Sequence, residues 1–173
     1  VIAFTAPEIA LEWNVSPQSL GTLFSAAPIG MALGALFIGP IADRIGRRMI
    51  IIVCLVIITI GMLSSAFAGS LGQLFILRLV TGLGIGGILP SLNTIVAEYS
   101  SSKRRDLSIG FMHAGYPIGA LVCGSISTFL IAQYSWQAVF VAGGIMSTVM
   151  LVVVIAGLPS RSNSCFPGSL RMR

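Results

Sequence analysis

One arginine, Arg78, interrupts a long apolar stretch, where a charged side chain is least expected. The runs 49–77 and 79–97 on either side of it contain no Asp, Glu, Lys or Arg. A guanidinium carries five N–H donors and pairs with a carboxylate through two parallel hydrogen bonds. At the centre of a membrane its insertion costs on the order of 3 kcal/mol, so a role in function is the default interpretation. We take Arg78 as a candidate residue for holding a carboxylate or for stabilising a network of charges within the protein, with extension of its side chain outward to water as the alternative.

Three further polar side chains lie in apolar stretches, namely Asn93, His113 and Tyr116. On a helix, Asn93 falls at the margin of the face that carries Arg78, and we interpret this face as a candidate cavity wall. The other residues of that face are Gly82, Ile85, Leu89 and Leu92. His113 is the only histidine and shares a helical face with Tyr116. Imidazole titrates near neutral pH, which suits proton coupling; a hydrogen-bonded packing residue is the alternative.

The most specific pattern is residues 39–48, Gly-Pro-Ile-Ala-Asp-Arg-Ile-Gly-Arg-Arg. Gly46 permits a tight turn, and Asp43 can accept N–H groups at a helix N-terminus. A second combination of acidic and basic residues consists of Glu98 and the later Arg104 and Arg105. Glu98 could pair with Arg47 or Arg48 in a gate network, or form a plain surface ion pair of little energy. The candidate residues of the first pattern are Gly39, Asp43, Arg44, Gly46, Arg47 and Arg48.

The composition shows what kind of chain must position these residues. Of 173 residues, 55% are hydrophobic and 9% are charged, whereas about a quarter are charged in a soluble domain. Four runs without Asp, Glu, Lys or Arg cover residues 13–42, 49–77, 79–97 and 107–160. Because a helix needs about 20 apolar residues to cross a bilayer, the first three runs hold one span each and the last holds two. The fold class is therefore an all-α integral membrane bundle.

Turn and interface residues divide the bundle into helices. We predict a partial helix at about 1–11 and full helices at about 17–42, 49–68, 71–97, 107–131 and 137–158. Pro17 suits a first helical turn, and the Tyr and Trp of residues 133–137 suit a membrane interface. Residues 1–159 form the transmembrane bundle. Residues 160–173 are polar and lack helical periodicity, and we interpret them as an irregular cytoplasmic tail that arises from a frameshift or premature end.

The net charge of +5 is unevenly distributed, and this distribution indicates the orientation of the bundle. No stretch interleaves basic and aromatic residues on a polar face, so we expect no nucleic-acid partner. Apart from Arg78, every Lys and Arg lies in a loop or tail on one side, which the positive-inside rule makes cytoplasmic. Six crossings with both ends inside are consistent with this. These loop residues are Arg44, Arg47, Arg48, Lys103, Arg104, Arg105, Arg161, Arg171 and Arg173.

Small residues four apart predict close helix packing in three spans. The pairs are Gly30 and Gly34, Gly82 and Gly86, and Gly115 and Gly119. The three cysteines have neither metal-ligand nor thioredoxin spacing, and we interpret them as structural. No nucleophile–base pair and no catalytic or metal-binding cluster is evident, so the sequence argues against an enzyme.

Residues 39–48 resemble the signature that joins helices 2 and 3 in the major facilitator superfamily. Residues 78–87 resemble its Gly-rich fourth helix, and residues 112–120 and 136–140 resemble the aromatic acid:proton symporter branch. The resemblance implies the N-terminal six-helix half of such a transporter, with the first helix incomplete. We expect a missing C-terminal half, because the substrate site in this fold lies between two halves.

For the intact parent, the resemblance implies proton-coupled uptake of a small aromatic carboxylate, such as a hydroxybenzoate, across the bacterial inner membrane. The expected coupling ion is a proton, with no cofactor, and the acids that bind it would lie in an Asp-Gly-x-Asp motif just before Val1. The fragment alone is expected to be inactive. A sugar or other organic-solute porter of the same superfamily, or a non-functional truncated product, is the alternative.

Overall fold

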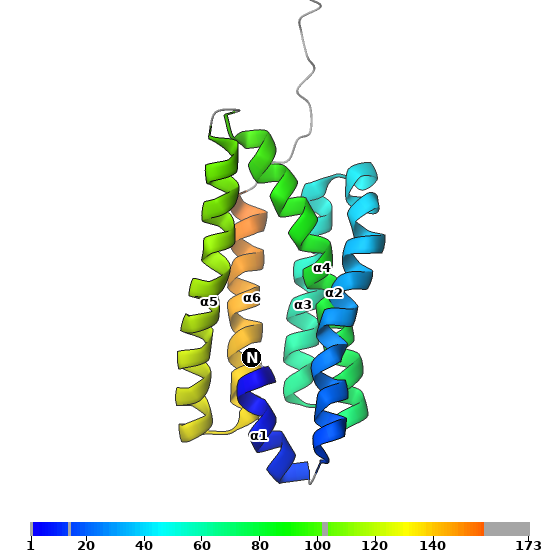
Figure 1. Ribbon diagram of the computed structural model, residues 1–173, viewed down its shortest axis with the longest axis vertical. Helices are drawn as coiled ribbons and strands as arrows, with labels where there is room; N and C mark the ends of the chain where they lie inside the picture. The colour runs from blue at the N-terminus through cyan, green and yellow to red at the C-terminus, as the bar shows by residue number, and fades with distance from the viewer. Residues whose placement is uncertain (1, 14, 102–103, 158–173) are drawn as a thin grey trace, which may run out of the picture.

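The computed structural model describes residues 2–13, 15–101 and 104–157, with the side chains of residues 2–4, 11, 43 and 99 outside the description. Within these ranges the chain is helical and contains no strand, which confirms the predicted all-α class. The helices are α1 (Ile2–Trp13), α2 (Pro17–Ile45), α3 (Arg47–Ala66), α4 (Leu71–Tyr99), α5 (Arg105–Gln133) and α6 (Trp136–Gly157). Figure 1 shows α1 at the lower end, between the pair α5 and α6 and the group α2, α3 and α4.

Five of the described helices, α2 to α6, are long and apolar enough to cross a membrane. The 12-residue α1 is shorter, at about 18 Å. Large apolar side chains such as Leu36, Phe111 and Val152 lie on the outer surface of the bundle. A surface of this kind faces lipid rather than water. The protein is therefore a multi-pass membrane protein.

Several helices extend beyond the ranges expected from the charge-free runs. α2 continues to Ile45, and α5 begins at Arg105 and ends at Gln133. A helix keeps its backbone hydrogen bonds in the headgroup region, so charged residues occupy its last turns there. α3 instead ends two residues early, at Ala66, where Phe67 donates its N–H to Ser64 and Ser65. The predicted tail at 160–173 lies outside the described residues.

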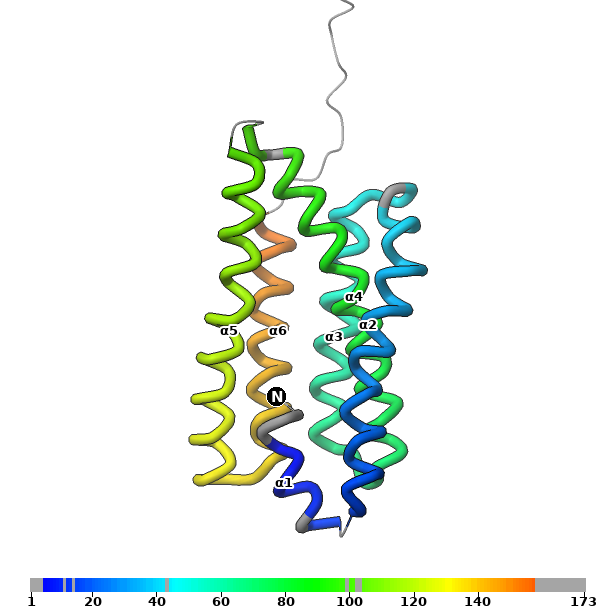
Figure 2. Tube along the Cα trace, in the orientation of Figure 1, coloured from blue at the N-terminus to red at the C-terminus, as the bar shows by residue number. Residues whose placement is uncertain are grey.

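Helix α4 packs against both α2 and α3, and α3 also packs against α6 (Figure 2). The contact between α2 and α4 is a backbone seam: a Cβ on Gly34 would overlap the carbonyl oxygen of Leu83, and a Cβ on Gly86 would overlap that of Met31. Gly30 and Gly82 belong to the same seam. Gly115 and Gly119 on α5 differ, since a Cβ there would meet nothing within 4 Å. Their predicted packing against a neighbouring helix is absent from the described part of the chain.

Two apolar clusters close the ends of the bundle. The upper cluster joins α2 and α3 through Ala42, Ile50 and Cys54. The lower cluster joins α1, α2, α3, α4 and α6 and lies at the end where α1 is drawn in Figure 1. It consists of the buried residues Ile9, Leu23, Met62, Ala66, Leu74, Trp136 and Phe140. These side chains form the surroundings of the second turn of α4.

Candidate functional site

Arg78 lies inside the bundle, on the second turn of α4, and is 6% exposed. Its Nη1 donates to Sδ of Met62 on α3 at 3.5 Å. The guanidinium carbon lies 4.4 Å from the centre of the Phe140 ring on α6. Because the guanidinium contacts α3 and α6, the side chain does not extend outward to water.

The charge of Arg78 is only partly compensated. Its Nε and Nη2 are buried and have no hydrogen-bond partner within the described chain. An unpaired buried charge costs several kcal/mol, which makes Arg78 a candidate anion-binding residue. Two adjacent guanidinium nitrogens of this kind match the two oxygens of a carboxylate.

The face predicted to line a cavity is in part a packing surface. A Cβ on Gly82 would overlap the carbonyl oxygen of Ala27 in α2, so Gly82 belongs to the backbone seam. For this residue the predicted role in a cavity wall is wrong. Helical spacing identified a shared face but not the helix that covers it. The other members of that face are half-buried, namely Ile85, Leu89 and Leu92.

Asn93 lies farther along α4, at its upper half. Its Oδ1 is buried and accepts no hydrogen bond within the described residues. Fifteen residues separate it from Arg78 in the same helix, which places the two about 22 Å apart along the axis. This distance exceeds the length of a single aromatic acid, so one such molecule cannot bridge both side chains.

His113 and Tyr116 both lie on the exposed surface of α5. In the part of the chain that the structure describes, neither makes a hydrogen bond or an ion pair. Arg78, by contrast, contacts residues of α3 and α6. The structure therefore does not join this pair to Arg78, and their predicted part in proton coupling stays a prediction.

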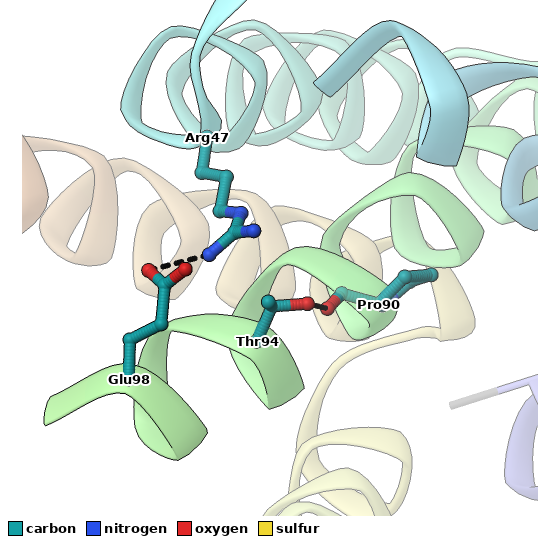
Figure 3. A network of polar contacts seen from close by, with 4 residues as sticks. All are labelled: Arg47, Pro90, Thr94 and Glu98. Carbon is teal, nitrogen blue, oxygen red and sulfur yellow. Dashed lines mark hydrogen bonds and ion pairs between the residues drawn. The ribbon is translucent and has the colours of Figure 1, made fainter. Parts of the chain in front are cut away.

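The basic junction between α2 and α3 contacts two other helices. Gly46 links α2 to α3 with a φ of 105°, a conformation that glycine adopts without strain. Figure 3 shows Arg47 directed at Glu98 near the end of α4, with Nη1 and Oε2 2.5 Å apart. One turn earlier in α4, the Thr94 hydroxyl donates to the Pro90 carbonyl at 2.8 Å. Since Glu98 is 58% exposed, the ion pair contributes at most about 1 kcal/mol.

Arg48, in the first turn of α3, contacts the end of α6. Its Nη2 donates to the carbonyl of Ile155, one of the last four of that helix, at 3.2 Å. Such carbonyls lack intrahelical donors, and a cation there also complements the helix dipole.

Replacing Arg48 by methionine should loosen the end of α6, because the methionine has similar length but no donor. We expect the free energy of unfolding to fall by about 1 kcal/mol. Amide hydrogen exchange of the last turn of α6 should speed up several-fold. Arg44→Met is the matched control, since Arg44 is exposed and makes no ion pair or hydrogen bond in the described structure. Equal exchange in both variants would contradict the capping role of Arg48.

The remaining residues of the two basic patterns make no such contacts within the described ranges. Arg44, Arg104 and Arg105 are exposed. A Cβ on Gly39 would meet nothing within 4 Å. The backbone of Asp43 lies in the last turn of α2, and its side chain lies outside the described residues. These residues are not brought together with Arg78, which lies at the other end of α4.

Sequence reasoning missed the contacts that hold the lower end together. The Trp136 indole N–H donates to a carboxylate oxygen of Glu12, which connects α6 to α1. Trp136 also makes edge-on ring contacts with Trp13 and with Phe140, at centre distances of 5.5 and 5.7 Å. Trp136 did carry a signal as an interface residue, and Phe140 lies in the stretch 136–140 that carries the family resemblance. No pattern linked Phe140 or Met62 to Arg78, since both are apolar.

Among the described residues, no group of three His, Cys, Asp or Glu side chains could hold a metal ion. Cys54 is buried and Cys123 half-buried, and both are free thiols. Their surroundings are those of packing residues.

Known proteins are similar to this chain over most of its length. A family model described as Major Facilitator Superfamily matches residues 1–168. A 4-hydroxybenzoate transporter of Pseudomonas putida is 36% identical over 158 residues, which cover 91% of this chain and 35% of that protein. A gallate transporter of Pseudomonas putida is 35% identical over 159 residues, which cover 92% of this chain and 35% of that protein. The chain thus spans about a third of the length of these curated relatives.

The fold also matches a solved structure, that of a major facilitator superfamily proton:xylose symporter bound to 6-bromo-6-deoxy-D-glucose. The TM-score is 0.80 at 20% sequence identity, with 90% of this chain and 40% of that one covered. At this identity the likeness concerns the fold alone.

Proposed function

We propose that this chain, which belongs to the Major Facilitator Superfamily, forms part of a secondary active transporter for small aromatic carboxylates. The observation that carries the proposal is the buried Arg78, whose Nε and Nη2 have no partner in the described chain. A carboxylate is the anion that a guanidinium binds through two hydrogen bonds. Relatives named as 4-hydroxybenzoate and gallate transporters support the proposal that this carboxylate belongs to an aromatic acid.

Uptake of such an anion calls for coupling to a cation. An anion that enters a negative interior works against about 2.3 kcal/mol per charge per 100 mV, and a co-transported proton cancels this cost. The acidic side chains that the structure describes, Glu8, Glu12, Glu98 and Asp106, are all exposed. The family resemblance implies that the proton-binding acids lie in an Asp-Gly-x-Asp motif of the first helix, and we expect no cofactor.

The orientation follows from the loop charges. The junctions of α2 with α3 and of α4 with α5 lie uppermost in Figure 1, and by their bounds they carry Arg44, Arg47, Arg48, Arg104 and Arg105. By the positive-inside rule this end faces the cytoplasm, and α1 lies toward the outer face. We place the transporter in the bacterial inner membrane.

The proposal requires a second six-helix half, which would close the substrate site at the midplane. Cells that produce only these 173 residues are therefore expected to show uptake equal to that of cells with an empty vector. The measurement is the initial rate of labelled 4-hydroxybenzoate uptake, with the intact transporter as positive control. Uptake by the 173-residue chain above the vector level would contradict the need for a second half.

Competition tests the substrate class. In cells with the intact transporter, unlabelled 4-hydroxybenzoate and gallate should inhibit uptake of labelled 4-hydroxybenzoate, whereas xylose should not. A protonophore should abolish accumulation. Transport of labelled xylose with no response to aromatic acids would replace the proposal by a sugar porter. If cells with the full-length gene transported neither labelled 4-hydroxybenzoate nor labelled xylose, the protein would be a non-functional product.

A further inference from the structure

The two unpartnered nitrogens of Arg78 are the pair that recognises a carboxylate side-on. In a guanidinium, the N–H of Nε and one N–H of Nη2 point in the same direction along one edge. This edge matches the two oxygens of a carboxylate. Both nitrogens are buried without a partner in the described chain, while Nη1 is directed at Sδ of Met62. Nη1, which contacts Met62, thus lies outside the edge formed by Nε and Nη2.

Phe140 fixes the plane of the same guanidinium. Its ring centre lies 4.4 Å from the guanidinium carbon of Arg78, the distance of a cation–π contact. The ring itself has little freedom, because Phe140 is 0% exposed and makes an edge-on contact with Trp136 at an interplanar angle of 81°. Trp136 is held in turn by its hydrogen bond to Glu12. The surroundings of Arg78 therefore fix its orientation before any anion arrives.

We propose that Phe140 and Met62 are positioning residues that hold Arg78 so that its Nε–Nη2 edge receives the carboxylate of the substrate. They thereby set the preference of the site for a carboxylate over an uncharged carboxamide of the same shape. This inference rests on the proposed function, which supplies the carboxylate substrate.

The physical basis is preorganisation. A free arginine side chain samples many rotamers, and a bidentate pair with a carboxylate requires one of them. A carboxamide offers one oxygen and a donor group in place of two acceptors, so it leaves one N–H of the edge unpaired. A loosely held guanidinium can bind either molecule through a single hydrogen bond. Loss of the ring should therefore weaken carboxylate binding more than carboxamide binding.

The test uses the intact transporter in proteoliposomes, with 4-hydroxybenzoate as substrate and 4-hydroxybenzamide as competing carboxamide. Phe140→Leu should raise KM for the acid about tenfold, with a smaller change in kcat. The preference of the transporter for the acid over the amide should decrease. Phe140→Tyr keeps the ring face and should restore both values. Phe75→Leu is the matched control, because Phe75 packs on the same lower cluster without a ring contact to the guanidinium.

Each outcome has a defined meaning. If Phe140→Leu and Phe75→Leu change KM and the acid-to-amide preference equally, the inference is overturned. If Phe140→Leu is not recovered folded, Met62→Leu decides, since it keeps the volume and removes the sulfur contact; an unchanged preference there overturns the inference. If Arg78→Ala affects acid and amide alike, the edge binds an acidic side chain of the protein, which also overturns it. Full uptake by Arg78→Ala would instead refute the proposed function.

Discussion

Replacing Arg78 by methionine is expected to abolish uptake by the intact transporter while leaving its fold at least as stable. The substitution removes the hydrogen bonds to the carboxylate, so the initial rate should fall by about 100-fold or more. It also removes a buried charge with two unpartnered nitrogens. Replacing such a charge by a well-packed apolar side chain is often neutral or stabilising by about 1 to 4 kcal/mol. The measurements are uptake of labelled 4-hydroxybenzoate and thermal unfolding of the purified protein.

The opposite signs of the two effects separate binding from structure. Arg78→Lys retains the charge but presents a point donor in place of a planar edge, so we expect it to recover only a small part of the uptake. Arg44→Met serves as control for the loss of one positive charge at an exposed position. If Arg78→Met lowered uptake and stability together, Arg78 would be a structural residue. Full uptake by that variant would exclude Arg78 from the substrate site.

A leucine at Gly86 is expected to prevent assembly of the bundle. A Cβ at this position would overlap the carbonyl oxygen of Met31, and no rotation of a side chain relieves an overlap with backbone. The axes of α2 and α4 would have to separate, which should cost more than about 3 kcal/mol. We expect little monodisperse protein after extraction in detergent, and a lower midpoint of thermal unfolding for what remains.

The chain offers a matched control for this substitution. Gly119 on α5 lies in the same four-residue spacing with a second glycine, but a Cβ there would meet nothing within 4 Å. In the 173-residue chain, Gly119→Leu should leave the yield and the unfolding midpoint unchanged or slightly raised, since leucine favours helix more than glycine does. If Gly86→Leu and Gly119→Leu lowered the yield and the unfolding midpoint equally, the seam between α2 and α4 would not be what limits stability.

The helices could be predicted because charge is so unevenly distributed along the chain. A span requires about 20 apolar residues, and only the charge-free runs supply them. Helix ends were less predictable, since α2 and α5 continue through charged residues such as Arg44 and Arg105. The glycine pairs show a further limit. The same spacing is packed in α2 and α4 and open at Gly115, because spacing permits a close approach but does not supply a partner.

The surroundings of Arg78 could be predicted only in part. A single charged residue between two apolar runs is conspicuous in the sequence, and Arg78 could therefore be identified as a candidate. Met62 and Phe140 lie 16 and 62 residues away from it and look like any other apolar residue of a span. Their contacts with the guanidinium arise from the packing of α3 and α6 around α4. These contacts depend on how α3 and α6 are placed along α4. The sequence around each residue alone does not determine that placement.

The seam between α2 and α4 also sets an order of events during synthesis. α2 ends at Ile45, whereas its closest partner is complete only when the ribosome has passed Tyr99. At the usual pace of translation this interval lasts several seconds. Throughout that time the glycine face of α2 lacks the helix that covers it in the bundle. We therefore expect the two helices to pack after each has been inserted, as in two-stage assembly. A stop in translation before α4 would leave α2 without its packing partner.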